Sequence, residues 1–161
     1  MRDTFCSSCA LAFDLPLGVY PRACAGCGQV VYRNPIPVAV ALVPVPRGLL
    51  TVQRAIEPKR GQFALPGGFV DFGEPWAAGC AREVREETGV EIDPGRVTLF
   101  AARSTPDGTR ILMFGACPPL PEMPSLLPNG ETLALGVWDG EGDLAFPIHT
   151  EVARDFLRGR R

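Results

Sequence analysis

The stretch REVREETG at 82–89 carries three glutamates and two arginines in eight positions. Charge this dense is typical of a solvated helix face. At about 100° per residue, however, Glu83, Glu86 and Glu87 are neighbours on one helix edge, and Glu87 falls inside the apolar arc. Three carboxylates that converge at a core border stay ionised together most readily with a cation between them. Oxygen ligands favour Mg²⁺ or Mn²⁺, so a surface helix and a metal-binding helix both fit this stretch alone.

The helix that would present these carboxylates is predicted over 75–88. Pro75 suits a first helical position, where a missing N–H costs nothing, and Gly89 suits the residue just past the end. Gly67 and Gly68 upstream allow a tight loop and a close backbone approach. The apolar arc of the predicted helix consists of Trp76, Ala77, Cys80, Ala81, Val84 and Thr88.

The surrounding stretch LPGGFVDFGEPWAAGCAREVREETGV, at 65–90, matches a known motif. Gly68 is followed after five residues by Glu74, and after seven more by RE-V-REETG-V. This pattern resembles the Nudix box of the Nudix hydrolase family, without substitution at any constrained position. The resemblance implies an α/β fold, namely an α/β/α sandwich with a mixed sheet. It also implies metal-dependent hydrolysis of a nucleoside diphosphate linked to another group.

The same resemblance assigns roles by position. The metal ligands would be the side chains of Glu83, Glu86 and Glu87 together with the backbone carbonyl of Gly67. Gly68 and Glu74 would support the loop, and Arg82 would pair with a neighbouring glutamate and hold its rotamer; an ordinary solvated arginine is the alternative. A carboxylate would deprotonate the attacking water. Our first candidate for this base is Glu83, and the second is Glu131, which an ordinary strand-edge role fits as well.

Four of the six cysteines form two CxxC pairs, Cys6–Cys9 and Cys24–Cys27. This spacing predicts one structural four-cysteine Zn²⁺ site, with two disulfides or free thiols as alternatives. We therefore expect a zinc ribbon at 1–34 and a Nudix hydrolase domain at 35–161. Since no secretion signal is recognisable, we expect a cytoplasmic protein with reduced thiols.

The combination of a zinc ribbon with a Nudix box resembles two groups, the NADH pyrophosphatase branch and the zinc-ribbon ADP-ribose/FAD pyrophosphatases. VYRNPIPVAVAL, RAIEPKRGQFALPGGFVDFGE and LAFPIH look closest to the second group. The SQPW-type stretch of the NADH branch is absent, and Ala134 stands where many relatives carry glutamate. The resemblance therefore implies cleavage of ADP-ribose, FAD or NADH with release of AMP.

The remaining chain predicts strands, one long loop and a closing helix. We expect a hairpin of 37–45 with 48–54, a pair at 96–104 and 109–117, and a strand at 131–139, while the stretch at 63–70 leads into the box. A surface loop is expected around 118–128 and the closing helix at 149–159. His149 would start that helix in a capping or first-turn role. The candidate substrate contacts are Arg54, Lys59 and Arg60 for phosphate and Phe69 among the phenylalanines for stacking.

Composition limits the partners. The formal net charge is −2, so no strong field for nucleic acid is expected, and no apolar run reaches the length of a membrane span. A nucleotide is the expected partner, and a homodimer is left open. Two other functions stay open: a nucleoside triphosphate pyrophosphohydrolase using the same metal site, and a non-catalytic nucleotide- or nucleic-acid-binding regulator.

Overall fold

The computed structural model describes residues 4–14, 18–125 and 130–159. The chain forms two compact units, Met1–Pro35 and Ile36–Arg161. The smaller unit contains a two-stranded antiparallel sheet, β1 (Arg22–Ala23) with β2 (Val30–Val31). So small a sheet buries little apolar surface, and a unit of this size usually needs a metal or disulfides to stay folded.

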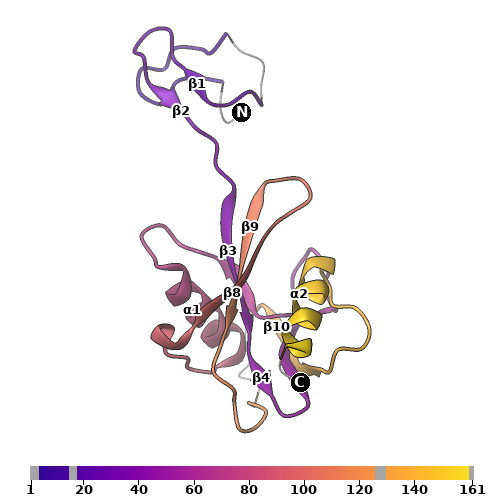
Figure 1. Ribbon diagram of the computed structural model, residues 1–161. Helices are drawn as coiled ribbons and strands as arrows, with labels where there is room; N and C mark the ends of the chain where they lie inside the picture. Colours follow the sequence, from indigo (N-terminus) through magenta and orange to yellow (C-terminus); the bar gives the residue numbers. More distant parts are fainter. Residues whose placement is uncertain (1–3, 15–17, 126–129, 160–161) are drawn as a thin grey trace. The chain divides into compact units, whose positions relative to one another are not determined.

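A mixed four-stranded sheet forms one part of the larger unit (Figure 1). Its order is β7-β3-β9-β8, built from β3 (Ile36–Leu42), β7 (Gly67–Phe69), β8 (Thr98–Ser104) and β9 (Arg110–Ala116). β3 runs parallel to β9, whereas β7 and β8 are antiparallel to their neighbours. The expected pairing of 96–104 with 109–117 is confirmed, although a short 3₁₀ turn (Pro94–Arg96) precedes β8.

A second sheet is antiparallel. It comprises β10 (Thr132–Trp138), β5 (Gly48–Arg54), β4 (Pro44–Val45) and β6 (Phe63–Ala64). The predicted hairpin of 37–45 with 48–54 is wrong for most of its length, because only Pro44 and Val45 pair with β5. Proline has no N–H to donate, so the ladder of β3 ends before Pro44 and the chain changes sheets there. The stretch at 63–70, which leads into the box, contains two short strands in different sheets, β6 and β7.

Two helices cover the sheets, α1 (Trp76–Thr88) and α2 (Pro147–Arg158) (Figure 1). α1 follows the extended residue Pro75, which is therefore the N-cap rather than the first helical residue. It ends at Gly89, whose φ of 75° is the left-handed conformation that glycine adopts without strain. α2 begins at Pro147, two residues earlier than predicted, since proline is well tolerated in a first turn.

β3 contributes side chains to two apolar clusters, one on each face of its sheet. Its residues alternate, with Ala39 and Ala41 in the cluster under α1 and Val40 and Leu42 in the cluster under α2. A strand buried on both faces reads as a continuous apolar run, which is what VAVAL at 38–42 shows. The box glutamates thus lie on a helix that packs against the buried half of β3, residues 39–42.

Two expectations concern other parts of the chain. The predicted surface loop at 118–128 has no helix or strand over 118–125, and 126–129 lie outside the described residues. Within the parts of the chain that the structure describes, no helix is long and apolar enough to cross a membrane.

Candidate functional site

The three box glutamates leave α1 in different environments. Glu87 is 7% exposed and the Glu83 side chain 12%, whereas the Glu86 side chain is 51% exposed. The burial of Glu87 agrees with its predicted place inside the apolar arc. A buried glutamate on a helix that otherwise buries Cys80 and Val84 is unusual for a purely structural position.

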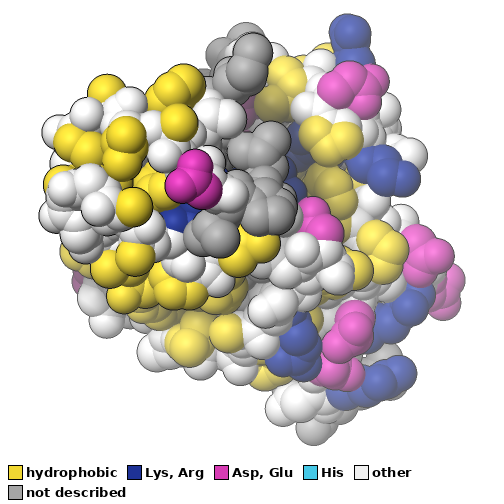
Figure 2. Space-filling model, turned by 90° about the horizontal axis from the view of Figure 1, so that it is seen from above, with side chains coloured by type: hydrophobic (Ala, Val, Ile, Leu, Met, Phe, Trp, Pro, Cys, Tyr) yellow, Lys and Arg dark blue, Asp and Glu magenta, His cyan; other side chains and the backbone are white. Residues whose placement is uncertain are grey.

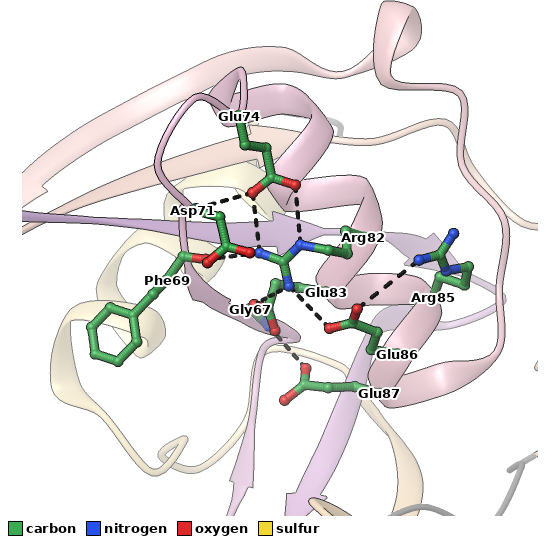
Figure 3. A network of polar contacts seen from close by, with 9 residues as sticks. All are labelled: Gly67, Phe69, Asp71, Glu74, Arg82, Glu83, Arg85, Glu86 and Glu87. Atoms are coloured by element: carbon green, nitrogen blue, oxygen red, sulfur yellow. Dashed lines mark hydrogen bonds and ion pairs between the residues drawn. The ribbon is translucent and has the colours of Figure 1, made fainter.

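Arg82 organises the carboxylates (Figure 3). Its Nη1 donates to Glu83 Oε1 at 2.8 Å and to Glu86 Oε2 at 2.9 Å. Its Nε and Nη2 donate to the two oxygens of Glu74 at 3.0 and 3.1 Å, a bidentate pair. Nη2 also reaches the carbonyl of Phe69 at 2.9 Å. Arg82 therefore ties α1 to the preceding loop and fixes the side chain of Glu83, as its predicted pairing with a glutamate requires.

The electrostatics of the site follow from burial and like charge. The hydrogen bonds from Arg82 lower the pKa of Glu74, and Glu74 in turn raises the pKa of Arg82. Burial raises the pKa of Glu83, although Arg82 opposes this. Burial, helped by the charges of Glu83 and Glu131, raises the pKa of Glu87 to about 8. Negative charge on Glu87 therefore needs a positive partner in this site.

Two glycines let the preceding loop approach the helix and the sheet. The N–H of Gly67 donates to Glu87 Oε2 at 2.9 Å. A Cβ on Gly67 would collide with the backbone of Ala39 in β3, and a Cβ on Gly68 would collide with the carboxylate of Glu83. Glycine is required at position 67 because the backbone of β3 occupies the space of a side chain, whereas a side chain at position 68 would displace the carboxylate of Glu83.

Glu131 lies just before β10 and reaches the same site. Its carbonyl accepts the N–H of Ala55 at 2.8 Å, and its charge raises the pKa of both Glu83 and Glu87. The Glu131 side chain is exposed, and the pairing of β10 with β5 fixes its backbone next to Ala55. Ala134 pairs with Gln53 on that ladder and offers no carboxylate.

Arg54, the last residue of β5, lies beside these carboxylates. Its Nε donates to the carbonyl of Pro58 at 2.8 Å, and its guanidinium carbon lies 5.3 Å from the ring centre of Phe146. Its positive charge lowers the pKa of Glu87 and, after burial, that of His149. Arg54 is therefore close to both the box carboxylates and the start of α2.

His149 does not cap α2, contrary to the capping role that was expected as one alternative. It lies in the first turn, 7% exposed, with its ring 5.0 Å from that of Phe146 and 5.7 Å from that of Phe114. The N-cap residue Phe146 makes no side-chain capping bond. Burial lowers the pKa of His149 to about 3, so the imidazole is neutral near pH 7.

The remaining predicted substrate contacts lie at the rim. Arg60 and Lys59 are exposed in the loop that joins β5 to β6. Phe69 is 52% exposed, and its ring points away from the carboxylates (Figure 3). Phe146 was missed as a functional candidate, because nothing local in the sequence relates it to Arg54. The only available signal is Pro147, which marks a helix start beside it.

The four ribbon cysteines lie together. Their sulfur atoms are all within 4.8 Å of one another, with Cys6 to Cys27 at 3.6 Å and Cys9 to Cys24 at 3.5 Å. All are free thiols. Sulfurs around a tetrahedral zinc with bonds of about 2.3 Å are about 3.8 Å apart, so the spacing fits this metal. The backbone N–H of Cys9 lowers the pKa of Cys6 to about 6, and that of Cys27 lowers the pKa of Cys24. The side chain of Cys24 raises the pKa of Cys9, and burial raises that of Cys27, so four thiolates together need a cation between them.

The two knuckles share one backbone pattern. The residue four positions after the first cysteine donates its N–H to that cysteine's carbonyl at 2.9 Å, from Ala10 to Cys6 and from Gly28 to Cys24. Ala10 and Gly28 have φ values of 60° and 73°, so each knuckle closes with a left-handed residue. Glycine suits the second of these positions, because it adopts a left-handed conformation without strain.

Comparison with known proteins identifies the family of this chain. The NUDIX domain family matches residues 35–157, and the chain therefore belongs to the Nudix family. The crystal structure of a NUDIX hydrolase from Nitrosomonas europaea is 26% identical, with a TM-score of 0.76 over 98% of this chain and 92% of that one. The fold is thus the α/β sandwich with a mixed sheet that the sequence predicted.

Two curated relatives indicate the kind of chemistry. The chain is 35% identical over 77 residues to an ADP-ribose pyrophosphatase of Methanocaldococcus jannaschii, covering 48% of this chain and 44% of that protein. It is 27% identical over 142 residues to the NAD-capped RNA hydrolase NudC of Photobacterium profundum, covering 88% of this chain and 52% of that protein. The chain spans about half the length of these relatives.

Proposed function

We propose that this protein is a pyrophosphohydrolase that cleaves the diphosphate linkage of a nucleoside diphosphate derivative of the ADP-ribose, FAD or NADH class and releases AMP. The observation that carries the proposal is the buried carboxylate of Glu87. Its pKa is raised by burial and by the charges of Glu83 and the exposed Glu131. A divalent cation would offset their mutual repulsion.

The donor set suits Mg²⁺ or Mn²⁺. Glu83, Glu86, Glu87 and the carbonyl of Gly67 would supply only oxygen ligands, which these hard cations prefer. When bound, the metal would neutralise phosphate charge and lower the pKa of an attacking water. Arg82 holds one oxygen of Glu83 and one of Glu86, so both carboxylates are oriented.

The chain's own residues would perform two further tasks. Glu83 would accept the proton of the water, since its burial and its raised pKa bring its basicity closer to neutral pH. Glu131 is the alternative base, because it faces the same carboxylates from outside the box. Gly68 would keep the loop close to Glu83 and leave space for the phosphate chain.

The substrate class rests on the relatives. One is named for ADP-ribose and the other for NAD-capped RNA, and both of these molecules contain a nucleotide joined through a diphosphate. The absence of an SQPW-type stretch favours ADP-ribose or FAD over NADH. In the small unit, the four cysteines would hold one structural Zn²⁺.

A substrate panel tests the proposal. NADH, NAD, ADP-ribose, FAD, diadenosine polyphosphates and nucleoside triphosphates would be incubated with the protein in Mg²⁺ and in Mn²⁺, and the products separated. We expect AMP from ADP-ribose or FAD. A much higher catalytic efficiency for pyrophosphate release from a nucleoside triphosphate would overturn the choice of substrate.

A binding regulator without catalysis is the competing class. Such a protein would bind nucleotide or nucleic acid without turnover in any metal. On the face drawn in Figure 2, acidic and basic side chains lie interspersed rather than in one area of single sign. Together with a formal net charge of −2, this gives no support to a nucleic-acid surface.

A further inference from the structure

Arg54 leaves β5 where the second sheet meets the candidate active site. It pairs with Thr132 in β10, and the next residue, Ala55, donates its N–H to the carbonyl of Glu131 at 2.8 Å. The backbone of Arg54 is therefore fixed on both sides of the strand end. Arg54 therefore lies opposite Thr132, the residue after Glu131, whose charge acts on Glu83 and Glu87.

The side chain of Arg54 is held by two neutral groups. Its Nε donates to the carbonyl of Pro58, and its guanidinium carbon lies 5.3 Å from the centre of the Phe146 ring. Among the residues that the structure describes, Arg54 forms no ion pair, whereas Arg82 is paired with three glutamates. A guanidinium held by a carbonyl and an aromatic ring keeps its terminal N–H groups for an anion.

The support behind Phe146 is neutral and rigid. Phe146 precedes α2, and its ring contacts that of His149, which is buried against Phe114. A neutral imidazole behind the ring does not repel Arg54, so the cation can remain on the ring face. The side chains of Arg54, Phe146 and His149 thus form a row of contacts from the candidate active site to the first turn of α2.

We propose that Phe146 is a positioning residue that holds the Arg54 guanidinium beside the box carboxylates, where it binds a phosphate oxygen of the nucleoside diphosphate substrate. This inference rests on the proposed function and deepens it. Arg54 supplies the positive charge, and Phe146 supplies no polar group of its own. Phe146 acts only through Arg54, because its ring already lies against the guanidinium.

The test is a double-mutant cycle on KM with the substrate that the panel selects, ADP-ribose being the first choice. Arg54→Gln removes the charge and should raise KM at least about 10-fold with a smaller change in kcat. Phe146→Leu removes the ring face and should raise KM about 3- to 10-fold. Phe146→Tyr keeps the ring and should restore KM to near the wild-type value.

Measuring Phe146→Leu both alone and together with Arg54→Gln distinguishes a positioning role from damage to the fold. In the Arg54→Gln background, Phe146→Leu should leave KM unchanged, because the guanidinium it holds is gone. A general loss of structure would instead raise KM in both backgrounds. Arg154→Gln is the matched control, since Arg154 also lies over an aromatic ring, that of Trp138 at 6.0 Å, and is expected to keep wild-type KM.

Each outcome decides the question. A wild-type KM in Phe146→Leu, or an effect of equal size in the Arg54→Gln background, would overturn the positioning role. A wild-type KM in Arg54→Gln would overturn the phosphate contact while leaving the proposed hydrolase intact. If the wild-type protein hydrolyses no member of the panel, the proposed function fails, and this inference fails with it.

Discussion

Glu87 is the residue on which the candidate active site depends most. Its carboxylate is buried and accepts the N–H of Gly67, and its pKa is raised by burial and by the charges of Glu83 and Glu131. Such a group lowers stability when charged and is expected at a position selected for binding a cation rather than for packing. Substitution by the isosteric amide separates these two effects.

Glu87→Gln should lower kcat/KM at least about 100-fold, since even the partners of metal ligands account for 10- to 100-fold effects. It should leave the free energy of unfolding of the metal-free protein unchanged or raised, because a neutral amide avoids the burial of charge. Steady-state kinetics and urea unfolding measure the two effects. Glu151→Gln, on the exposed face of α2, is the control and should behave as wild type. Normal turnover in Glu87→Gln would rule out the metal-binding role.

The identity of the base is decided by comparing Glu83→Gln with Glu131→Gln. Glu83→Gln should be the more severe in kcat, because Glu83 is fixed by Arg82 and buried beside the loop glycines. Both variants should bind substrate, so kcat rather than KM is the informative quantity. If Glu131→Gln lowers kcat more than Glu83→Gln, the base lies outside the Nudix box.

His149 predicts a pH dependence of stability. Its pKa falls from 6.5 to about 3 on folding, chiefly through burial. Above pH 6.5 neither state is protonated, whereas below it the unfolded state gains a proton that the folded state does not. Stability should therefore fall as pH drops, by about 2 kcal/mol at pH 5 relative to pH 7.5. In His149→Phe the free energy of unfolding, measured with urea, should fall less between pH 7.5 and pH 5 than in the wild type. An equal fall in the two proteins would show that His149 takes up its proton in the folded state as well.

At the scale of elements, the loop and α1 act as one unit. Gly68 lies against the carboxylate of Glu83, and Arg82 joins the helix to Glu74 in the loop. The position of Glu83 therefore depends on the absence of a side chain in β7.

Gly68→Ala should lower kcat at least about 10-fold by displacing Glu83, with a smaller effect on the melting temperature, because the collision involves a partly buried side chain rather than the core. Gly159→Ala, where a Cβ would make only ordinary contacts of 3.7 Å, is the matched control. Wild-type kcat in Gly68→Ala would show that the position of Glu83 is not critical.

The elements also show what could be predicted from the sequence. The periodicity of α1 predicted the burial of Glu87, because the helix repeat is local. β3 was assigned to the wrong partner, since a run buried on both faces carries no information about which strand pairs with it. The stack of Arg54 on Phe146 joins β5 to the start of α2, a contact that only the tertiary fold creates.

At the scale of the whole molecule, the two units should differ in what stabilises them. The larger unit has two apolar clusters, whereas the smaller depends on its four cysteines. Elemental analysis after extensive dialysis should find one zinc per chain. Cys9→Ser should lose that zinc and unfold the small unit while the larger unit still binds Mn²⁺. A mass that indicates two disulfides in freshly purified protein would contradict the zinc site.

The measurement that tests the central claim most directly is the identification of the products from ADP-ribose and FAD in Mg²⁺ or Mn²⁺, with wild-type protein and Glu87→Gln compared side by side. The proposal predicts AMP as a product with wild-type protein, none without a divalent cation, and at least about 100-fold slower release with Glu87→Gln. AMP formation that is independent of divalent metal, or equal in the two proteins, would contradict it.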